Sequence, residues 1–326
     1  MDSRHLNKSS TATDVASLFR EQIHGKTVVI TGISPGGLGE ALCAALATQR
    51  PHHLILTART PSKAQAVTAA VLQQCPALKV SVVELDLASF RSVRKAAAHI
   101  KLISSNAVDV LINNAGVMCV PEHTLTEDKF ELHLAVNYMG PFLLARLLAE
   151  PLAAAKGRIV NVASSTHMVS PFRLSDPNFI GSNTLPAAEE PSKDASEAIG
   201  VPWTCGYSPV VAYAQSKTAT ILHAKAIAHG ALSNSVQAFS VNPGIIRTNL
   251  WRHMPSDDVD HILASLPTKT ATEGASTVLF AALAPNLNDC AGAYLEDCAV
   301  SRPAPHAEDA SLASKLWKYT EQVLDA

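Results

Sequence analysis

The sequence predicts an α/β fold in which one doubly wound parallel sheet carries helices on both faces. Short β-branched runs alternate with longer segments rich in alanine and leucine, which is typical of such a sheet. The runs are apolar throughout rather than alternating, as expected for strands that are buried on both sides. No linker divides the 326 residues, so we expect a single domain over residues 25–326 behind an arm at residues 1–24.

The predicted elements follow one another in a regular order. β-branched residues and leucine cluster in six predicted strands, at residues 26–31, 53–57, 79–85, 108–112, 158–162 and 236–241. Predicted helices lie between them, at residues 38–48, 62–74, 89–103, 126–152 and 211–229. The second of these should end before Pro76, and the fourth should be kinked at Pro141. Asp14 should cap a short helix in the arm, and an amphipathic helix is expected within residues 304–326, around Leu312, Leu316 and Trp317.

One stretch, residues 170–209, interrupts this order. It contains six prolines around an acidic, polar centre, and loops of this length usually serve as functional lids or are disordered. We expect an insertion beside the substrate. Its apolar residues would either cover an apolar substrate or only anchor the loop: Phe172, Phe179, Ile180, Val201, Trp203 and Tyr207.

Composition and charge exclude several classes of function. The 26 basic and 28 acidic residues give a net charge of −2, and no basic cluster predicts a nucleic-acid or anionic-membrane partner. The thirteen histidines and six cysteines show no metal-binding spacing, so no metal is expected. The polar N-terminus has no signal-peptide pattern, and no apolar segment is long enough to span a bilayer. We therefore expect a cytoplasmic protein with reduced thiols.

Several chemically distinctive segments follow predicted strands. TGISPGGLGE, at residues 31–40, joins a strand to a helix, where glycines allow a pyrophosphate to approach the backbone. After the second strand stands Arg59, where a carboxylate would bind an NAD ribose; with Ser62 and Lys63 behind it, the arginine suits a 2′-phosphate instead. Asp86-Leu87 and the sequence NNAG, at residues 113–116, follow the next two strands, at the sheet edge where open α/β sheets bind ligands.

Tyr213 precedes Lys217 by four residues, which places both side chains on one face of a helix. At about 4.5 Å and an effective dielectric of about 20, an ammonium and a phenolate attract each other by roughly 3.7 kcal/mol. That would lower a tyrosine pKa from about 10 toward 7, and we expect Tyr213 to act as an acid and base. Ser164, at the end of the fifth strand, would complete the group.

With these motifs in order, the chain resembles the short-chain dehydrogenase/reductases. The resemblance runs from Lys26 to at least Asn249 and also includes Asn137 in HLAVNYMG, Ser164 in RIVNVASS, and VNPGIIRT at residues 241–248. It implies a Rossmann fold and an oxidoreductase that interconverts a ketone or aldehyde and an alcohol with NAD(P)(H). Since Arg59 replaces the carboxylate of NAD enzymes, NADP(H) is the expected cofactor, with NAD(H) the weaker candidate.

The resemblance assigns roles by position. Tyr213 would be the acid and base, Ser164 would hold the substrate oxygen, Lys217 would bind the nicotinamide ribose, and Asn137 would hold a water linking Lys217 to solvent. Asn113 would support the fold nearby. Thr248 would bond the carboxamide. The cofactor would contact Gly32, Ser34, Gly37, Leu38, Gly39, Arg59, Lys63, Asp86, Leu87, Asn114, Ala115, Gly116, Tyr213, Lys217, Pro243, Gly244, Ile246 and Thr248.

The chain departs from the common family pattern in two places. The glycine turn is one residue longer and contains Pro35, which leaves open whether Gly36 or Gly37 lies at the pyrophosphate. The insertion at 170–209 separates Ser164 from Tyr213 more than in the shortest members, as in retinol-dehydrogenase-like members and many fungal reductases. Tyr207 competes with Tyr213 for the catalytic position, but it has valine rather than lysine four residues later.

Two functions are compatible with these residues. The main hypothesis is an NADP(H)-dependent oxidoreductase acting on a small, apolar carbonyl or alcohol. The alternative is a catalytically idle member that binds the nucleotide as a redox sensor or scaffold, although binding alone does not require Ser164 or Tyr213. Family members often form homodimers or homotetramers through the helices at 126–152 and 211–229, and the same is possible for this chain.

Overall fold

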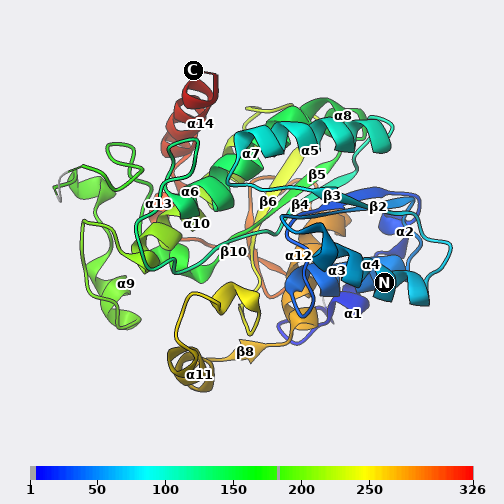
Figure 1. Cartoon of the computed structure of the whole chain (residues 1–326), viewed down its shortest axis with the longest axis horizontal. Coiled ribbons are helices and arrows are strands. Elements are labelled where there is room, and N and C mark those ends of the chain that lie inside the picture. The colour runs from blue at the N-terminus through cyan, green and yellow to red at the C-terminus, as the bar shows by residue number, and fades with distance from the viewer. Residues whose placement is uncertain (1–4, 182–183, 326) are drawn as a thin grey trace.

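The computed structural model describes residues 5–181 and 184–325, and it confirms the predicted α/β fold. One eight-stranded sheet has the order β10-β9-β6-β5-β4-β1-β2-β3. Helices cover both of its faces, so that the domain has three layers (Figure 1). The first four residues of the predicted arm, and residues 182–183 of the predicted insertion, lie outside the described part.

The six predicted strands form the parallel centre of the sheet. They pair in the order β3, β2, β1, β4, β5, β6, so the sheet runs outward in both directions from the pair β1 and β4. Their bounds are Thr27–Ile30 for β1, His53–Ala58 for β2, Val80–Glu84 for β3, Val110–Asn113 for β4, Arg158–Val162 for β5 and Gln237–Asn242 for β6. All four residues of β1 and all six of β2 are buried, which explains why these runs are apolar without alternation.

The sequence did not reveal the strands at one edge. β9 (Tyr294–Glu296) extends the parallel sheet from β6, and β10 (Ala299–Ser301) turns back antiparallel to it. The two residues of their hairpin, Asp297 and Cys298, both have positive φ, at 50° and 59°. Tight hairpins of this kind usually carry asparagine or aspartate followed by glycine. Because cysteine stands where glycine is expected, the sequence gives no hairpin signal. A further short pair, β7 (Ile245–Ile246) and β8 (Thr268–Lys269), lies apart from the main sheet.

One face of the sheet is covered by the helices α1, α2, α3, α4 and α12. Their bounds are Ala12–Leu18 for α1, Arg20–Ile23 for α2, Leu38–Ala47 for α3, Pro61–Gln74 for α4 and Ala271–Leu283 for α12. The predicted cap of α1 was wrong by three residues. Thr11 is the N-cap, because its hydroxyl oxygen accepts from the amide of Asp14, and the Asp14 carboxylate completes a capping box by accepting from the amide of Thr11.

The opposite face carries α5 (Phe90–Ile103), α10 (Pro209–Ala228) and the segment predicted as one long helix at 126–152. That prediction was wrong at its start and in its continuity. Helical structure begins only at Leu132, where the Glu131 carboxylate accepts from two amides, and a π-helical turn follows at Ala135–Met139. Beyond it lie α7 (Gly140–Leu147) and α8 (Ala149–Ala154). The α-helix is interrupted at Leu148, and the change from π-helix to α-helix falls at Met139 and Gly140, next to Pro141, where the kink stays a prediction.

The insertion at 170–209 is anchored in the body of the protein. Arg173 is fully buried, pairs with Asp176 at 2.8 Å, and stacks on Phe179 with its guanidinium carbon 4.1 Å from the ring centre. Phe172 belongs to the main core. After a short 3-10 turn, α9 (Lys193–Ala198) stands at the outer edge of this insertion (Figure 1).

The C-terminal segment also packs on the body. It forms α13 (Pro305–Glu308) and α14 (Ala310–Asp325), and Leu316 and Trp317 of α14 are buried against α10. The remaining long helix is α11 (Ser256–Ser265), which follows β7 in the chain. It is amphipathic, and Val259 is its one buried residue. Within the described residues, no helix is both long and apolar enough to cross a membrane.

Candidate active site

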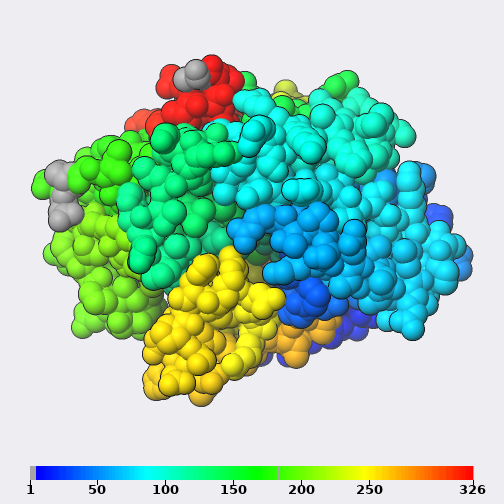
Figure 2. All heavy atoms as spheres, viewed as in Figure 1, coloured from blue at the N-terminus to red at the C-terminus, as the bar shows by residue number. Residues whose placement is uncertain are grey.

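A cavity of about 1070 Å³ lies at the carboxyl ends of the parallel strands, beside the point where the strand order reverses. Each central strand contributes the residues that directly follow it. In Figure 2 the yellow segment near residue 250 lies between the blue N-terminal third and the green insertion. One side of the cavity is therefore formed by the glycine turn and the strand ends, and the other by α9, α11 and the segment between β7 and α11.

The glycine turn has the geometry of a close backbone approach. Gly32 has a φ of +76°, and a Cβ on it would lie 2.5 Å from the Cα of Ala115. Gly37 lines the cavity and is the N-cap of α3, which no side chain caps. Gly36 has open space around it, while a Cβ on Gly39 would meet Ile33 at 2.9 Å. Of the two glycines that the sequence left open, Gly37 lines the cavity and Gly36 does not, whereas Gly39 packs against Ile33; contact with a pyrophosphate stays a prediction.

Two alanine substitutions should separate close approach from backbone strain. Gly36→Ala should cost about 1 kcal/mol, because it only forces alanine into a left-handed conformation. Gly32→Ala adds a clash with the backbone of Ala115 and should cost about 2–4 kcal/mol in total. Thermal unfolding of both variants measures the difference. Equal losses would mean that the turn has room to relax.

The glycine turn and its surroundings suit a dinucleotide. The start of α3 offers backbone amides and the positive end of the helix dipole to a phosphate. Arg59 and Lys63 line the same cavity beyond β2. Every residue predicted from the sequence to bind the cofactor lines this cavity except Gly39.

Arg252 is a cavity residue that the sequence did not reveal. Its Nη1 donates to the carbonyl of Asn249 at 2.9 Å. Burial lowers the pKa of Arg252, and the nearby positive charge of Arg59 lowers it further. In the described part of the chain, neither arginine has an acidic partner within ion-pair distance. Two like charges left unpaired on one cavity favour an anionic ligand there.

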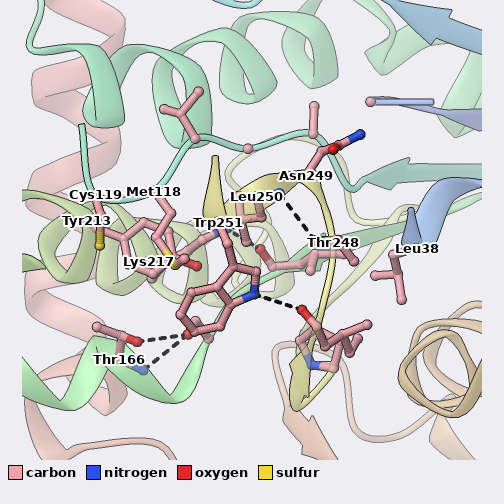
Figure 3. A pocket seen from close by; sticks show the side chains of 18 of the residues that line it. Leu38, Met118, Cys119, Thr166, Tyr213, Lys217, Thr248, Asn249, Leu250 and Trp251 are labelled. Atoms are coloured by element: carbon pink, nitrogen blue, oxygen red, sulfur yellow. Dashed lines mark hydrogen bonds between the residues drawn. The ribbon is translucent and has the colours of Figure 1, made fainter. Parts of the chain in front are cut away.

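The predicted catalytic side chains converge on the inner wall of the cavity. Ser164 follows β5, and Tyr213 and Lys217 lie one turn apart on α10. The Ser164 hydroxyl lies near Tyr213 and donates to the Oγ1 of Thr166 at 3.1 Å, while the Lys217 Nζ lies 5.6 Å from the centre of the Tyr213 ring. Lys217 also donates to the carbonyl of Val162 at 2.7 Å. Figure 3 shows Tyr213 and Lys217 gathered with Met118 and Cys119 on the side opposite Leu38.

Electrostatics at this wall differ from the sequence-based expectation. Burial raises the pKa of Tyr213 well above its ordinary value, and the nearby Ser164 hydroxyl offsets only part of this. The expected lowering by Lys217 was wrong because the lysine is buried too, and burial lowers its own pKa to about 7. At neutral pH the protein therefore holds Tyr213 as a neutral phenol beside a partly protonated amine. That is the form of tyrosine that can donate a proton.

Asn137 lies behind this wall rather than on it. Its Nδ2 donates to the carbonyl of Val117 and to the Oγ of Ser216, both at 2.9 Å. Its Oδ1 accepts from the amide of Val117 at 2.9 Å. Both amide hydrogens are therefore used within the protein, and Asn137 fixes the cavity-lining loop at Val117. A water held by Asn137 stays a prediction. Such a water would have to donate a hydrogen bond to an oxygen atom of Asn137.

The other candidate tyrosine has a structural position. Tyr207 does not line the cavity; its hydroxyl donates to the carbonyl of Val120 at 2.7 Å. Its ring packs edge-on against Phe179 and His123. Of the six apolar residues singled out in the insertion, Val201 alone lines the cavity. Most of the six lie in the insertion outside the cavity. The part of the cavity wall that the insertion provides is formed by Val201 together with Ala195, Ala198 and Ile199.

The outer part of the cavity is apolar and was largely hidden in the sequence. Trp251 stands across the cavity, and its indole Nε1 donates to the carbonyl of Ile246 at 2.8 Å (Figure 3). We define this outer part by Trp251 and three half-exposed apolar residues that line the same cavity, Met168, Ile199 and Leu266; Arg252, which follows Trp251, lines the cavity as well. No local pattern marks these residues, because they come from four separate segments that only the fold brings together.

Comparisons with known proteins agree with this geometry. Residues 26–175 match the family model described as short chain dehydrogenase. Over 238 residues the chain is 56% identical to the oxidoreductase fscI of Fusarium equiseti, a match that covers 72% of this chain and 92% of the relative. Retinol dehydrogenase 13 of Homo sapiens is 33% identical over 303 residues, covering 90% of this chain and 83% of the relative.

A solved structure shares the fold. The crystal structure of a short-chain type dehydrogenase/reductase from Mycobacterium marinum matches with a TM-score of 0.63 and 22% identity, covering 86% of this chain and 96% of that chain. The solved structure and the two sequence relatives are all named as oxidoreductases or dehydrogenases.

Proposed function

Because the chain belongs to the short-chain dehydrogenase/reductase family, we propose that it is an NADP(H)-dependent oxidoreductase that interconverts an apolar ketone or aldehyde and its alcohol. The observation that carries this proposal is the meeting of two groups of residues on one cavity. The glycine turn and Arg59 lie at one end, and Ser164, Tyr213 and Lys217 lie on the inner wall. A nucleotide-binding scaffold would need only the first group.

Each catalytic side chain has a separate task in this proposal. The neutral Tyr213 phenol donates its proton to the carbonyl oxygen of the substrate. Ser164 hydrogen-bonds the same oxygen and orients it toward the phenol. Lys217, with a pKa of about 7, can return a proton toward Tyr213 near neutral pH. A bound nicotinamide would supply the hydride, and the protein supplies position and electrostatics.

The preference for NADP(H) rests on positive charge beyond β2. The position after this strand holds Arg59 rather than a carboxylate, with Lys63 and Arg252 on the same cavity. Guanidinium groups bind phosphate through paired N–H donors, so a 2′-phosphate should be favoured over a ribose hydroxyl.

Cofactor titrations test this preference. Arg59→Ala should weaken NADPH binding by about tenfold or more, since a charged hydrogen bond is worth about 1.5–3 kcal/mol. NADH binding should change little. Arg20→Ala, which removes an exposed arginine paired with Glu21 away from the cavity, is the control and should change neither. An unchanged preference in Arg59→Ala would contradict the role of this residue.

An apolar, uncharged substrate is favoured by the outer part of the cavity. The lining there is formed by aliphatic, methionine and tryptophan side chains, with Thr166, His261 and Ser265 as polar exceptions. One relative is named a retinol dehydrogenase, and retinol is itself an apolar alcohol. A carboxylate held among these apolar side chains, away from Arg252, would lose its hydration without gaining a charged partner.

A matched pair of ketones tests the substrate class and the proposed function together. We compare a neutral aliphatic ketone with one of the same length ending in a carboxylate, following NADPH oxidation. The charged ketone should have a kcat/KM lower by about a hundredfold, for a desolvation cost of about 3 kcal/mol. Leu266→Lys places a cation at a half-exposed position of the cavity lining and should reduce the difference in kcat/KM between the two ketones. Leu102→Lys, at an exposed position of α5 outside the cavity, should leave this difference unchanged. Equal rates for both ketones would contradict an apolar site.

A further inference from the structure

One buried histidine connects the turn that carries Ser164 to the C-terminal segment. His167 is 2% exposed and lies in the 3-10 turn Ser165–Val169. Its Nδ1 lies 2.6 Å from the carbonyl oxygen of Ser164. Its Nε2 lies 2.9 Å from the backbone nitrogen of Ala304, which is 137 residues further along the chain.

The hydrogen positions on this histidine follow from its two partners. A carbonyl oxygen can only accept, so Nδ1 must carry the hydrogen and donate it to Ser164. A backbone N–H can only donate, so Nε2 must accept from Ala304. Burial lowers the pKa of His167 to about 4, which keeps the ring neutral and both bonds in place near pH 7. The histidine is thus a fixed two-ended bridge.

The C-terminal end of this bridge is firmly held. Ala304 stands between Pro303 and Pro305, so it provides the one backbone N–H of this tripeptide. Two residues on, the Nε2 of His306 donates to the carbonyl of His167 at 3.0 Å. Thr218, the residue next to Lys217, donates its hydroxyl to the carbonyl of Ser170 at 2.7 Å, and its Oγ1 lies 3.2 Å from the carbonyl of His167. Tyr294 of β9 packs edge-on against the His167 ring.

The other end of the bridge, at the carbonyl of Ser164, helps to set the position of the Ser164 hydroxyl. The Oγ of Ser164 accepts from the amide of Thr166 at 3.2 Å, within the same turn that His167 holds. A displacement of the Ser164 carbonyl would therefore move the hydroxyl relative to Tyr213. Small errors in the placement of a catalytic group cost large factors in rate.

We propose that His167 is a positioning residue, which uses the backbone of Ala304 as a support to hold Ser164 in line with Tyr213. This inference rests on the proposed function, because the serine matters only if it holds a substrate oxygen. It makes residues 303–306 part of the active-site framework, although none of them lines the cavity.

Two substitutions of His167 test its two hydrogen bonds separately. The amide of asparagine reaches the place of Nδ1, so His167→Asn can keep the bond to Ser164 and loses the bond to Ala304. Glutamine reaches the place of Nε2, so His167→Gln can keep the bond to Ala304 and loses the bond to Ser164. If His167 only filled space, the larger glutamine would be the better substitute. If it positions Ser164, asparagine should be the better one.

Steady-state kinetics then rank the variants. We expect His167→Gln to lower kcat by more than about tenfold, with KM and the NADPH dissociation constant within about twofold. His167→Asn should keep kcat within about threefold of the wild type. The control is His53→Asn, which removes a buried histidine bonded to Ser81 at the far end of β2 and should lower stability without lowering kcat. Equal kcat values for the two His167 variants, or a higher value for His167→Gln, would overturn the inference.

Amide hydrogen exchange provides a readout that does not depend on turnover. His167→Asn should speed exchange at Ala304, and His167→Gln should speed it at Thr166, because each amide loses the support described above. An identical pattern in both variants would contradict the bridge. If the wild type turned over no carbonyl compound, the proposed function would fail, and the exchange pattern alone would still decide whether the bridge exists.

Discussion

Tyr213→Phe should lower turnover by about a thousandfold and leave NADPH binding within about twofold. The substitution removes the phenol hydroxyl that passes a proton to the substrate oxygen in the proposed function, and general acid catalysis contributes factors of about 100 to 10,000. The ring itself stays, so the packing around this buried side chain should be kept. Turnover is followed as ketone-dependent NADPH oxidation, and binding by fluorescence titration.

The matched control for this substitution is Tyr207→Phe. Tyr207 is the other tyrosine of the same region, and its hydroxyl bonds the carbonyl of Val120 outside the cavity. Its loss should change turnover by less than about threefold, at a cost in stability of about 1 kcal/mol. If Tyr213→Phe kept its rate, or if Tyr207→Phe lost it, the assignment of the acid would be wrong.

Acidification from pH 7 to pH 5 should lower the free energy of unfolding by about 6 kcal/mol through three buried histidines. Burial lowers the pKa of His53 and His167 to about 4 and that of His223 to about 3, from an ordinary value of 6.5. Unfolded, all three residues bind a proton below about 6.5, whereas folded they do not until about 4 or lower. The unfolded state therefore binds more protons in this window, and stability falls with pH by about 2 kcal/mol for each residue.

Denaturant unfolding at several pH values measures this slope. Lys217, with a pKa of about 7, contributes only about 0.4 kcal/mol, because below pH 6 it is protonated in both states. His223→Asn keeps an acceptor for the Nδ2 of Asn161 but cannot titrate, so it should remove about a third of the pH dependence. His24→Asn, at an exposed position, should leave the dependence unchanged. A slope that His223→Asn does not alter would mean that this histidine titrates normally in the folded protein.

The sequence was sufficient for the centre of the fold because the signal there is local. Buried strands such as β1 and β2 are short apolar runs, and the glycine turn lies directly between β1 and α3. The edge hairpin of β9 and β10 was missed because its turn uses Asp297 and Cys298 without a glycine. The start of the helix at Leu132 was misplaced because its capping signal, Glu131, is an unusual N-cap residue.

The site was predictable only where one segment carries the signal. Tyr213 and Lys217 share a helix, so their proximity could be read from spacing alone. The sign of the pKa shift at Tyr213 could not, since it depends on burial by segments far away in the chain. Arg252, Trp251 and the pairing of His167 with Ala304 were hidden for the same reason. Assembly into homodimers or homotetramers stays a prediction.

The most direct test of the proposed activity follows the hydride itself. The wild-type protein is incubated with an aliphatic ketone and NADPH deuterated at one or the other face of the nicotinamide C4, and the product is analysed by mass spectrometry. We expect an alcohol that carries one deuterium from one of the two cofactors, and no such product with Tyr213→Phe. Tight NADPH binding without deuterium transfer to any ketone or aldehyde of a broad apolar panel would contradict the activity and favour a nucleotide-binding scaffold.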